Sequence, residues 1–243
     1  APALMAAAGW RGTWAVCAAV AAAWALLVAM TQPRRAAHAT TPAPIAALAA
    51  ATLRSRGPWL LALCFAFYAG QFTGIFSFLP SVYREYGISA QLGASLTALA
   101  VASNGGGGLA AGLLLQRGVD RATLIVFVGI TMAACAWAAF GSSLGFGWRY
   151  AAIVVLSTVG GLIPGTLFAT APFYAPSIAA VSTTVGLMQQ GSGLGQIVLP
   201  PAIAALAQYS GGWSSTWIAT GAAALVTVAL GLMIGRYDAV RPR

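Results

Sequence analysis

The sequence predicts an all-α protein embedded in a lipid bilayer, with about seven transmembrane helices. Only 6% of its 243 residues are charged and 60% are hydrophobic, whereas about a quarter of the residues in an average soluble domain carry charge. So few polar groups cannot cover a water-soluble particle of this size. Long apolar runs recur along the chain, separated by arginines, prolines and Gly/Ser clusters. We therefore expect a membrane-spanning helical bundle.

The individual spans follow from the length of these runs. A helix that crosses the hydrocarbon core needs about 20 mostly apolar residues. Residues 1–8 are apolar but too short to cross, and they predict the end of a preceding helix followed by a turn at Gly9. The chain starts at Ala1 without a leader-like segment, so we expect an interior piece of a longer protein. Seven stretches are long enough to cross: 11–30, 58–80, 91–115, 122–140, 149–171, 178–207 and 214–235.

The only long connection, residues 31–57, divides the chain into three parts. Residues 1–30 hold the end of one helix and the first complete span. Within the connection, Pro42 and Pro44 break regular structure, and residues 45–56 predict a short helix on the cytoplasmic surface. Residues 58–243 form six tightly connected spans, which predicts antiparallel neighbours in one bundle.

The positions of the basic residues, which give the net charge of +9, indicate how the chain is oriented in the membrane. All twelve basic residues are arginines, and they lie between apolar runs rather than in one stripe, which argues against nucleic acid as a partner. Basic residues near span ends stay in the cytoplasm. The arginines therefore predict an external N-terminus and a cytoplasmic C-terminus in a plasma (inner) membrane, because only Arg11, Arg84 and Arg149 then lie outside. The nine predicted inside are Arg34, Arg35, Arg54, Arg56, Arg117, Arg121, Arg236, Arg241 and Arg243.

The connection after the third span carries a recognisable pattern. Residues 112–121 read Gly-Leu-Leu-Leu-Gln-Arg-Gly-Val-Asp-Arg. This resembles the cytoplasmic loop signature of the major facilitator superfamily, in the degenerate form of its second copy between helices eight and nine. Gln116 stands where the family has an acid, and Val119 where it has glycine. The positions that carry the resemblance are Gly112, Gln116, Arg117, Asp120 and Arg121.

The layout strengthens this resemblance. A span, a long basic loop and six further spans resemble helices six to twelve of a twelve-helix facilitator. The glycine- and glutamine-rich stretch 186–195, followed by Pro200-Pro201, is similar to helix eleven of cyanate and nitroimidazole porters. The resemblance implies a C-terminal half whose partner is a missing N-terminal helical half, and a solute site at the bilayer midplane with alternating access.

Uncharged polar residues near the span centres are the candidates for contact with a solute. Gln189, Ser192 and Gln196 are spaced i, i+3, i+7, so they share one helical face. The alternative is that these groups form hydrogen bonds between helices and only hold the bundle together. Amides, hydroxyls and aromatic rings also lie near the centres of the second and third spans. The lining candidates are Tyr68, Gln71, Phe72, Asn104, Gln189, Ser192 and Gln196.

Several residues within the spans are expected to bend helices. A run of glycines in the third span permits a bend or a close backbone approach. Tight helix packing through small residues is the alternative explanation. A proline inside a helix removes one backbone hydrogen bond and kinks it. The hinge or kink candidates are Gly105, Gly106, Gly107, Pro164 and Pro200.

The residue types in the spans argue against other classes of protein. No predicted span has Asp, Glu, Lys, Arg or His near its centre, which speaks against membrane-embedded proteolysis, a metal site or any cofactor. A seven-helix receptor or signalling protein fits the number of spans but not the facilitator-like loop. We therefore expect a secondary active transporter of a small organic solute, not an enzyme.

Overall fold

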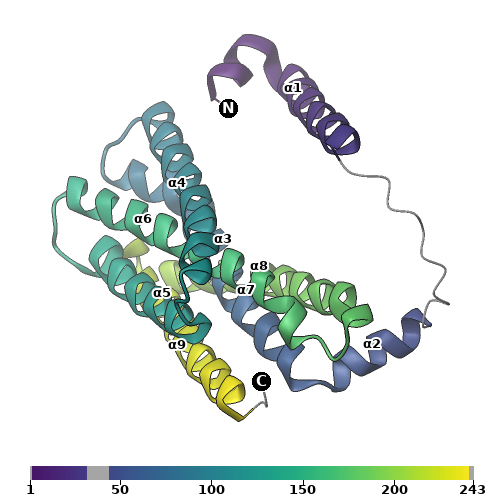
Figure 1. Ribbon diagram of the computed structural model, residues 1–243. Coiled ribbons are helices and arrows are strands. Elements are labelled where there is room, and N and C mark those ends of the chain that lie inside the picture. Colours follow the sequence, from purple (N-terminus) through teal and green to yellow (C-terminus); the bar gives the residue numbers. More distant parts are fainter. Residues whose placement is uncertain (1, 32–43, 241–243) are drawn as a thin grey trace. The chain divides into compact units, whose positions relative to one another are not determined.

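The computed structural model describes residues 2–31 and 44–240 of the chain (Figure 1). The arginines predicted inside at positions 34, 35, 241 and 243, and Pro42, lie outside these ranges. The chain divides into two compact units, residues 1–42 and 43–243.

The first unit is one long helix, α1 (Pro2–Thr31). Its backbone leaves the helical conformation at Gly9, with φ 65° and ψ −178°, at the position where the sequence predicts a turn. Glycine adopts this positive φ without the steric cost that a Cβ imposes. From Ala7 to Thr31 the helix is long and apolar enough to cross a membrane, and large side chains such as Trp14 and Trp24 are exposed within this unit. An apolar surface of this extent requires lipid or other helices around it.

The second unit begins with the short helix α2 (Ile45–Arg54), which lies in the predicted segment 45–56. Every described element of the unit is helical, and the predicted all-α membrane class is confirmed. The remaining elements are α3 (Arg56–Glu85), α4 (Ala90–Gln116), α5 (Arg121–Ala136), the π-helical turn η1 (Trp137–Gly141), α6 (Phe146–Gly160), α7 (Leu162–Tyr174), the 3₁₀ turn η2 (Ile178–Ala180), α8 (Val181–Ser210), the 3₁₀ turn η3 (Trp213–Ser215) and α9 (Thr216–Val240).

Six segments among the described residues are long and apolar enough to span a bilayer, one fewer than the seven predicted. The difference lies in α8, which has 30 residues, as many as α3, but is not among the six. Its polar residues, which include Gln189, Gln190 and Gln196, lower its hydropathy. A spanning helix tolerates such groups where it faces protein or a water-filled cavity rather than lipid.

One predicted span, 149–171, consists of two helices. The span from Phe146 to Tyr174 is interrupted at Gly161, where α6 ends and α7 begins. Pro164 has no N–H to donate to the carbonyl four residues earlier, that of Gly160, so the regular hydrogen-bond pattern cannot continue through this turn. In contrast, α4 runs without interruption through Gly105–Gly107, and α8 through Pro200.

The packing within the second unit centres on α3, which packs along α8 and also contacts α4, α7 and α9. Helix α5 packs along α9, and α4 packs on α6 and α7. Fully buried apolar side chains from several helices fill the interior between them. The largest include Leu61, Ile75, Ile125, Ile163, Leu167 and Met188.

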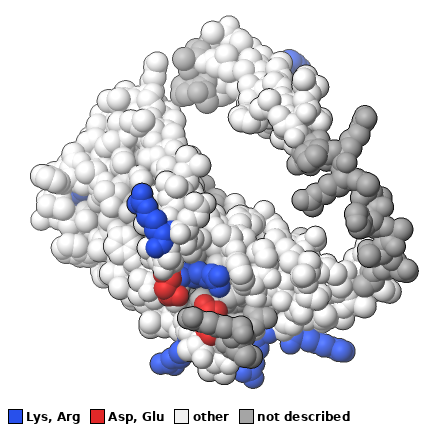
Figure 2. Space-filling model, viewed as in Figure 1, with Lys and Arg blue, Asp and Glu red and all other residues white. Residues whose placement is uncertain are grey.

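The helix ends form two opposite surfaces. Gly57 at the start of α3 packs on Tyr174 at the end of α7, and Gly235 near the end of α9 packs on Ala122 at the start of α5. At the other end, the Phe78 and Trp213 rings lie 5.0 Å apart. Charged side chains gather toward the end where α9 finishes, below a largely uncharged helical surface (Figure 2). Among the described residues of this unit, the arginines at this end are Arg54, Arg56, Arg117, Arg121 and Arg236, and those at the other end are Arg84 and Arg149.

Candidate functional site

A hydrogen-bonded node joins three helices near the middle of α3 and α4. Asn104 of α4 donates from Nδ2 to the Tyr68 hydroxyl of α3 at 2.9 Å and to the Ser157 carbonyl oxygen of α6 at 2.8 Å. Tyr68 is buried, whereas Asn104 is only half-buried. Both amide hydrogens are used within the bundle, so Oδ1 is the atom of Asn104 with capacity left for a ligand.

Aromatic rings extend from this node along α3. The Phe72 ring centroid lies 5.9 Å from that of Tyr68 and 4.4 Å from that of Phe76. On the other side, Phe65 stacks on Tyr68 and meets Phe168 of α7 edge to face at 5.5 Å. Such a row offers flat apolar surfaces beside a hydrogen-bonding amide, a combination typical of sites for small organic molecules.

Helices α3 and α8 are held at short range by small residues. Ala62, Ala66 and Gly70 follow one another at four-residue spacing on α3 and face Gly191 and Gly195 on α8. A Cβ on Gly195 would overlap the carbonyl oxygen of Ala66. The small-residue spacing that the sequence shows on both helices is therefore used for backbone-to-backbone packing, as is common in membrane bundles.

The flank of this interface carries a second polar group. Gln196 donates from Nε2 to the Ser192 hydroxyl at 3.0 Å, and its Oε1 accepts from the Thr73 hydroxyl at 3.2 Å. Ser192 is buried, while the Gln196 side chain is exposed. Gln196 thus links α8 to α3 by hydrogen bonds, which is the alternative to solute contact considered for these residues. Part of its amide still lies at the surface of the unit.

The two other glutamines predicted to line a site occupy different environments. Gln189 is exposed on α8, on the same side of the helix as Gln196, because seven residues correspond to nearly two turns. Gln71 is fully buried, and neither amide atom has a hydrogen-bond partner among the described residues. In this conformation Gln71 does not face an open surface of the bundle, so its contact with a solute stays a prediction.

The glycines of α4 separate into two groups. Gly107 lies against the end of α6 and Gly161: a Cβ there would overlap the Thr158 carbonyl oxygen, and one on Gly161 would overlap the Asn104 carbonyl oxygen. This contact supports the packing explanation for Gly107. Gly105 and Gly106 have no atoms within 4 Å of a built Cβ, so nothing in the packing of this conformation requires glycine at these two positions.

The loop resembling the facilitator signature joins α4 to α5. Asp120 accepts a hydrogen bond from the Thr123 backbone N–H at 3.0 Å and caps the N-terminus of α5, where a carboxylate is favoured by the helix dipole. Arg121 lies over the Phe173 ring at 4.2 Å, which ties the loop to the end of α7. Gly112, Gln116, Asp120 and Arg121 line a cavity of about 500 Å³, whereas Arg117 is exposed and caps the C-terminus of α4.

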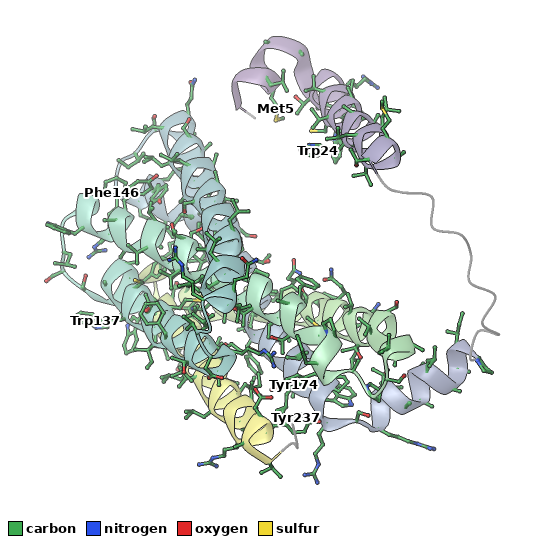
Figure 3. All side chains as sticks on the ribbon, in the orientation of Figure 1. Met5, Trp24, Trp137, Phe146, Tyr174 and Tyr237 are labelled. Carbon is green, nitrogen blue, oxygen red and sulfur yellow. The ribbon has the colours of Figure 1, made fainter. Side chains whose placement is uncertain are left out.

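Other polar contacts join helix ends in ways the sequence pattern does not signal. Tyr174 donates to an Asp238 carboxylate oxygen at 2.6 Å, next to a ring contact of 5.2 Å between Tyr174 and Tyr237 (Figure 3). At the opposite end, Arg149 donates to the Tyr86 hydroxyl. These partners are more than 60 residues apart in the chain. For the first contact the available signal was Tyr174 itself, since the hydroxyl group of a buried tyrosine needs a partner.

The described residues therefore offer amides, hydroxyls and aromatic rings in the spans, with the acids at helix ends. Glu85, Asp120 and Asp238 each lie within a few residues of an end, and no three His, Cys, Asp or Glu side chains within residues 2–31 and 44–240 lie together in a metal-binding arrangement. These features define the class: a multi-pass helical membrane protein with uncharged polar groups inside its bundle.

Comparison with known proteins identifies the family within this class. The sequence profile of the Major Facilitator Superfamily matches residues 1–185, and the chain belongs to this family. A seven-helix receptor is not favoured by this match. No curated protein gives a significant match to the chain.

Solved structures share the fold. A Major Facilitator Superfamily transporter, FucP, in the outward conformation is 14% identical, with a TM-score of 0.72, and the match covers 93% of this chain and 54% of that one. A variant of the E. coli fucose:proton symporter FucP is 16% identical, also with a TM-score of 0.72, and the match covers 93% and 55% of the two chains. The chain spans about half the length of these structures.

Proposed function

We propose that this chain forms the C-terminal half of a secondary active transporter that moves a small organic solute by alternating access. The observation that carries the proposal is the set of uncharged polar groups near the middle of α3, α4 and α8, in a bundle of the facilitator fold. Asn104 retains an acceptor atom beside an aromatic row, and Gln189 and Gln196 are exposed on one side of α8. Polar groups at this depth mark solute pathways.

The assignment to the C-terminal half is supported by three features. The chain spans about half of the FucP structures, the loop at 112–121 resembles the second copy of the family signature, and a long basic segment precedes α3. An N-terminal helical half then supplies the other wall of the site. The glycine- and glutamine-rich part of α8 supports a relation to the cyanate and nitroimidazole porters.

The chemistry of this wall favours an uncharged or weakly polar solute. The side chains near the centre of the described spans are amides, hydroxyls and aromatic rings, which recognise hydroxyl and carbonyl groups and flat apolar faces. A proton-coupling carboxylate, if transport is coupled, belongs to the other half, because Glu85, Asp120 and Asp238 all lie at helix ends. One structural neighbour is a fucose:proton symporter, which makes L-fucose a useful first probe.

The proposed orientation places the arginine-rich end of the second unit in the cytoplasm of a bacterial-type inner membrane. Of the arginines in residues 44–240, five lie at this end and two at the other, in the direction that the positive-inside rule requires. Helix α2 and the C-terminal end of α9 are then cytoplasmic, and the N-terminal end of α1 is external.

The adjacent glutamines 189 and 190 provide a matched test. Gln189 lies on the side of α8 that carries Gln196, whereas Gln190 lines an apolar groove between α3 and α8. In proteoliposomes of the full-length protein, counterflow is measured with two uncharged radiolabelled probes, L-fucose and 2-nitroimidazole. We expect Gln189→Ala to lower the initial rate for the transported probe about tenfold, the loss of one or two hydrogen bonds to the solute.

Gln190→Ala is expected to leave this rate unchanged, and both variants should insert in the membrane at wild-type levels. Equal rates for the two variants remove Gln189 from the site. Absence of counterflow for both probes contradicts the proposed solute classes.

A further inference from the structure

A cavity at the arginine-rich end lies between the α2–α3 junction and the last turns of α9. Its volume is about 560 Å³. It is separate from the Tyr68–Asn104 node and from the loop at 112–121, and neither contributes a residue to its lining. The residues around it come from two stretches that are far apart in sequence, the α2–α3 junction and the end of α9, so the cavity exists only because α9 returns beside the start of α3.

The rim of the cavity is positively charged. Arg54 ends α2, Arg56 begins α3, and Arg236 lies near the end of α9, and all three side chains are exposed. Within residues 44–240 none of these guanidinium groups forms an ion pair. The nearest acid in sequence, Asp238, accepts the Tyr174 hydroxyl at 2.6 Å, and two residues of helix turn it about 200° away from Arg236. Within the described part of the chain, the rim therefore holds positive charge that no acidic side chain compensates.

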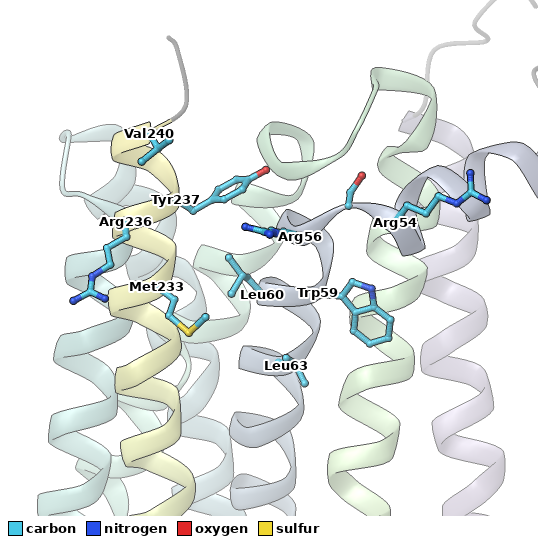
Figure 4. Close-up of a pocket in the computed structure, with 10 residues that line it drawn as sticks. Arg54, Arg56, Trp59, Leu60, Leu63, Met233, Arg236, Tyr237 and Val240 are labelled. Atoms are coloured by element: carbon cyan, nitrogen blue, oxygen red, sulfur yellow. The ribbon is translucent and has the colours of Figure 1, made fainter.

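The wall of the cavity is apolar. Leu60 and Leu63 of α3 and Met233 of α9 lie deeper along the helices than Arg56 and Tyr237 (Figure 4). Leu63 is 42% exposed and Met233 is 50% exposed, so both present apolar surface toward the cavity side. This apolar wall runs from the charged rim along the spanning part of the helices. Such a surface fits a molecule with a charged headgroup and a hydrocarbon chain.

Trp59 marks the depth of the rim in the membrane. Its indole Nε1 donates to the Leu53 carbonyl oxygen at 2.9 Å, which fixes the ring between α2 and α3. Tryptophan is enriched at the boundary between headgroups and hydrocarbon. The arginines thus lie at headgroup level, and the leucines and methionine lie at the level of the acyl chains.

We propose that this cavity binds an anionic phospholipid of the cytoplasmic leaflet. The phosphate lies near Arg56, with Arg54 and Arg236 on its two sides, and an acyl chain covers Leu60, Leu63 and Met233. Guanidinium groups bind phosphate oxygens in bidentate fashion, and basic pockets between helices on the cytoplasmic side suit acidic headgroups. A small soluble anion satisfies the arginines but leaves the apolar wall uncovered, so the lipid matches more of the cavity.

The choice of leaflet rests on the proposed orientation, whereas lipid binding itself does not. The test is titration of the purified full-length protein, in neutral detergent, with dioleoyl phosphatidylglycerol or dioleoyl phosphatidylcholine, followed by native mass spectrometry. We expect the phosphatidylglycerol to bind with at least tenfold lower Kd. Inorganic phosphate at millimolar concentration serves as the soluble-anion arm and is expected to displace little of the bound lipid.

Two double variants with equal charge loss locate the site. Arg56→Gln with Arg236→Gln is expected to remove most of the preference for phosphatidylglycerol, about a tenfold loss for two surface arginines. Arg84→Gln with Arg117→Gln, two exposed arginines outside the cavity, is expected to retain it. In an otherwise wild-type background, Leu63→Gln should weaken binding of the dioleoyl lipid more than that of a dihexanoyl phosphatidylglycerol, because only the long chain reaches the wall.

Equal affinity for the two dioleoyl lipids, or equal loss in the two double variants, overturns the proposal. Displacement by inorganic phosphate as efficient as by lipid assigns the cavity to a soluble anion and overturns it as well. The readout does not involve solute movement. A protein that transports a solute but shows no lipid preference contradicts this inference alone, and one that binds the lipid but moves no solute contradicts only the proposed function.

Discussion

Two helix crossings in this bundle use glycine in the same way but leave their polar groups in different environments. Where α4 crosses the α6–α7 break, Gly107 and Gly161 bring the backbones together. Both amide hydrogens of the nearby Asn104 are donated to groups inside the bundle. Where α3 crosses α8, Gly195 does the same, but the neighbouring Gln196 stays exposed. Both amides link helices, and the position of each amide relative to the crossing, rather than its chemistry, decides how far it stays exposed.

The largest expected effect breaks the second crossing. Gly195→Leu places a side chain against the Ala66 carbonyl oxygen, so α3 and α8 must separate along their length. Overpacking a tight contact costs about 1–3 kcal/mol and sometimes more, and we expect a clear fall in the melting temperature of the detergent-purified protein.

Gly193→Leu is the matched control for this variant. Gly193 lies on the same helix with no atom within 4 Å of a built Cβ, so its melting temperature should stay near that of the wild type. Equal destabilisation by the two substitutions contradicts backbone packing at Gly195.

The next effect concerns the first crossing. Asn104→Leu removes the donors to the Tyr68 hydroxyl and the Ser157 carbonyl oxygen, and a buried group left without its partner costs about 1–3 kcal/mol. Tyr68→Phe removes only one of the two hydrogen bonds and should cost less. The combined variant should be less destabilised than the sum of the single changes, since the leucine no longer leaves a tyrosine hydroxyl unpaired. Full additivity in thermal unfolding indicates that the two side chains do not interact.

A smaller change of opposite sign is expected at Gln71. Its amide is fully buried without a partner among the described residues, and such a group carries an uncompensated desolvation cost. Gln71→Leu should therefore keep or slightly raise the melting temperature. If Gln71 meets the solute in another conformation of the transport cycle, the same variant lowers counterflow while remaining stable. A stable variant with unchanged counterflow removes Gln71 from the lining residues.

The smallest effect on stability tests the hinge prediction in α4. In the Gly106→Ala variant the added Cβ meets no atom within 4 Å. Alanine forms helix more readily than glycine, so the change stabilises the helix by up to about 1 kcal/mol. If the glycines allow α4 to bend during transport, this variant should be as stable as the wild type and slower in counterflow. Gly107→Ala, in contrast, should lose stability because of the Thr158 carbonyl oxygen. Wild-type counterflow by Gly106→Ala argues that Gly106 is not a hinge.

Part of the candidate site could be predicted from residue types and spacing. The i, i+7 relation of Gln189 and Gln196 follows from helix geometry alone, as does the choice of Asn104 as a polar residue in mid-span. Thr73 and the Ser157 carbonyl could not be identified in this way, because a threonine or a backbone oxygen in a span carries no distinctive pattern. The burial of Gln71 was also inaccessible, since two residues on the same helix, such as Gln71 and Thr73, point about 200° apart and only the neighbouring helices distinguish inside from outside.

The sequence by itself determined that the protein is an all-helical membrane protein, where most of its spans lie and which helix ends are rich in arginine. These properties depend on hydrophobic length and charge along the chain, which are local. Three features depend on the tertiary structure alone. They are the contact of α4 with the helix break at Gly161, the hydrogen bond between Thr73 and Gln196, and the cavity lined by Arg54, Arg56 and Arg236. Each depends on which helices pack together, and packing brings together residues that no local pattern connects.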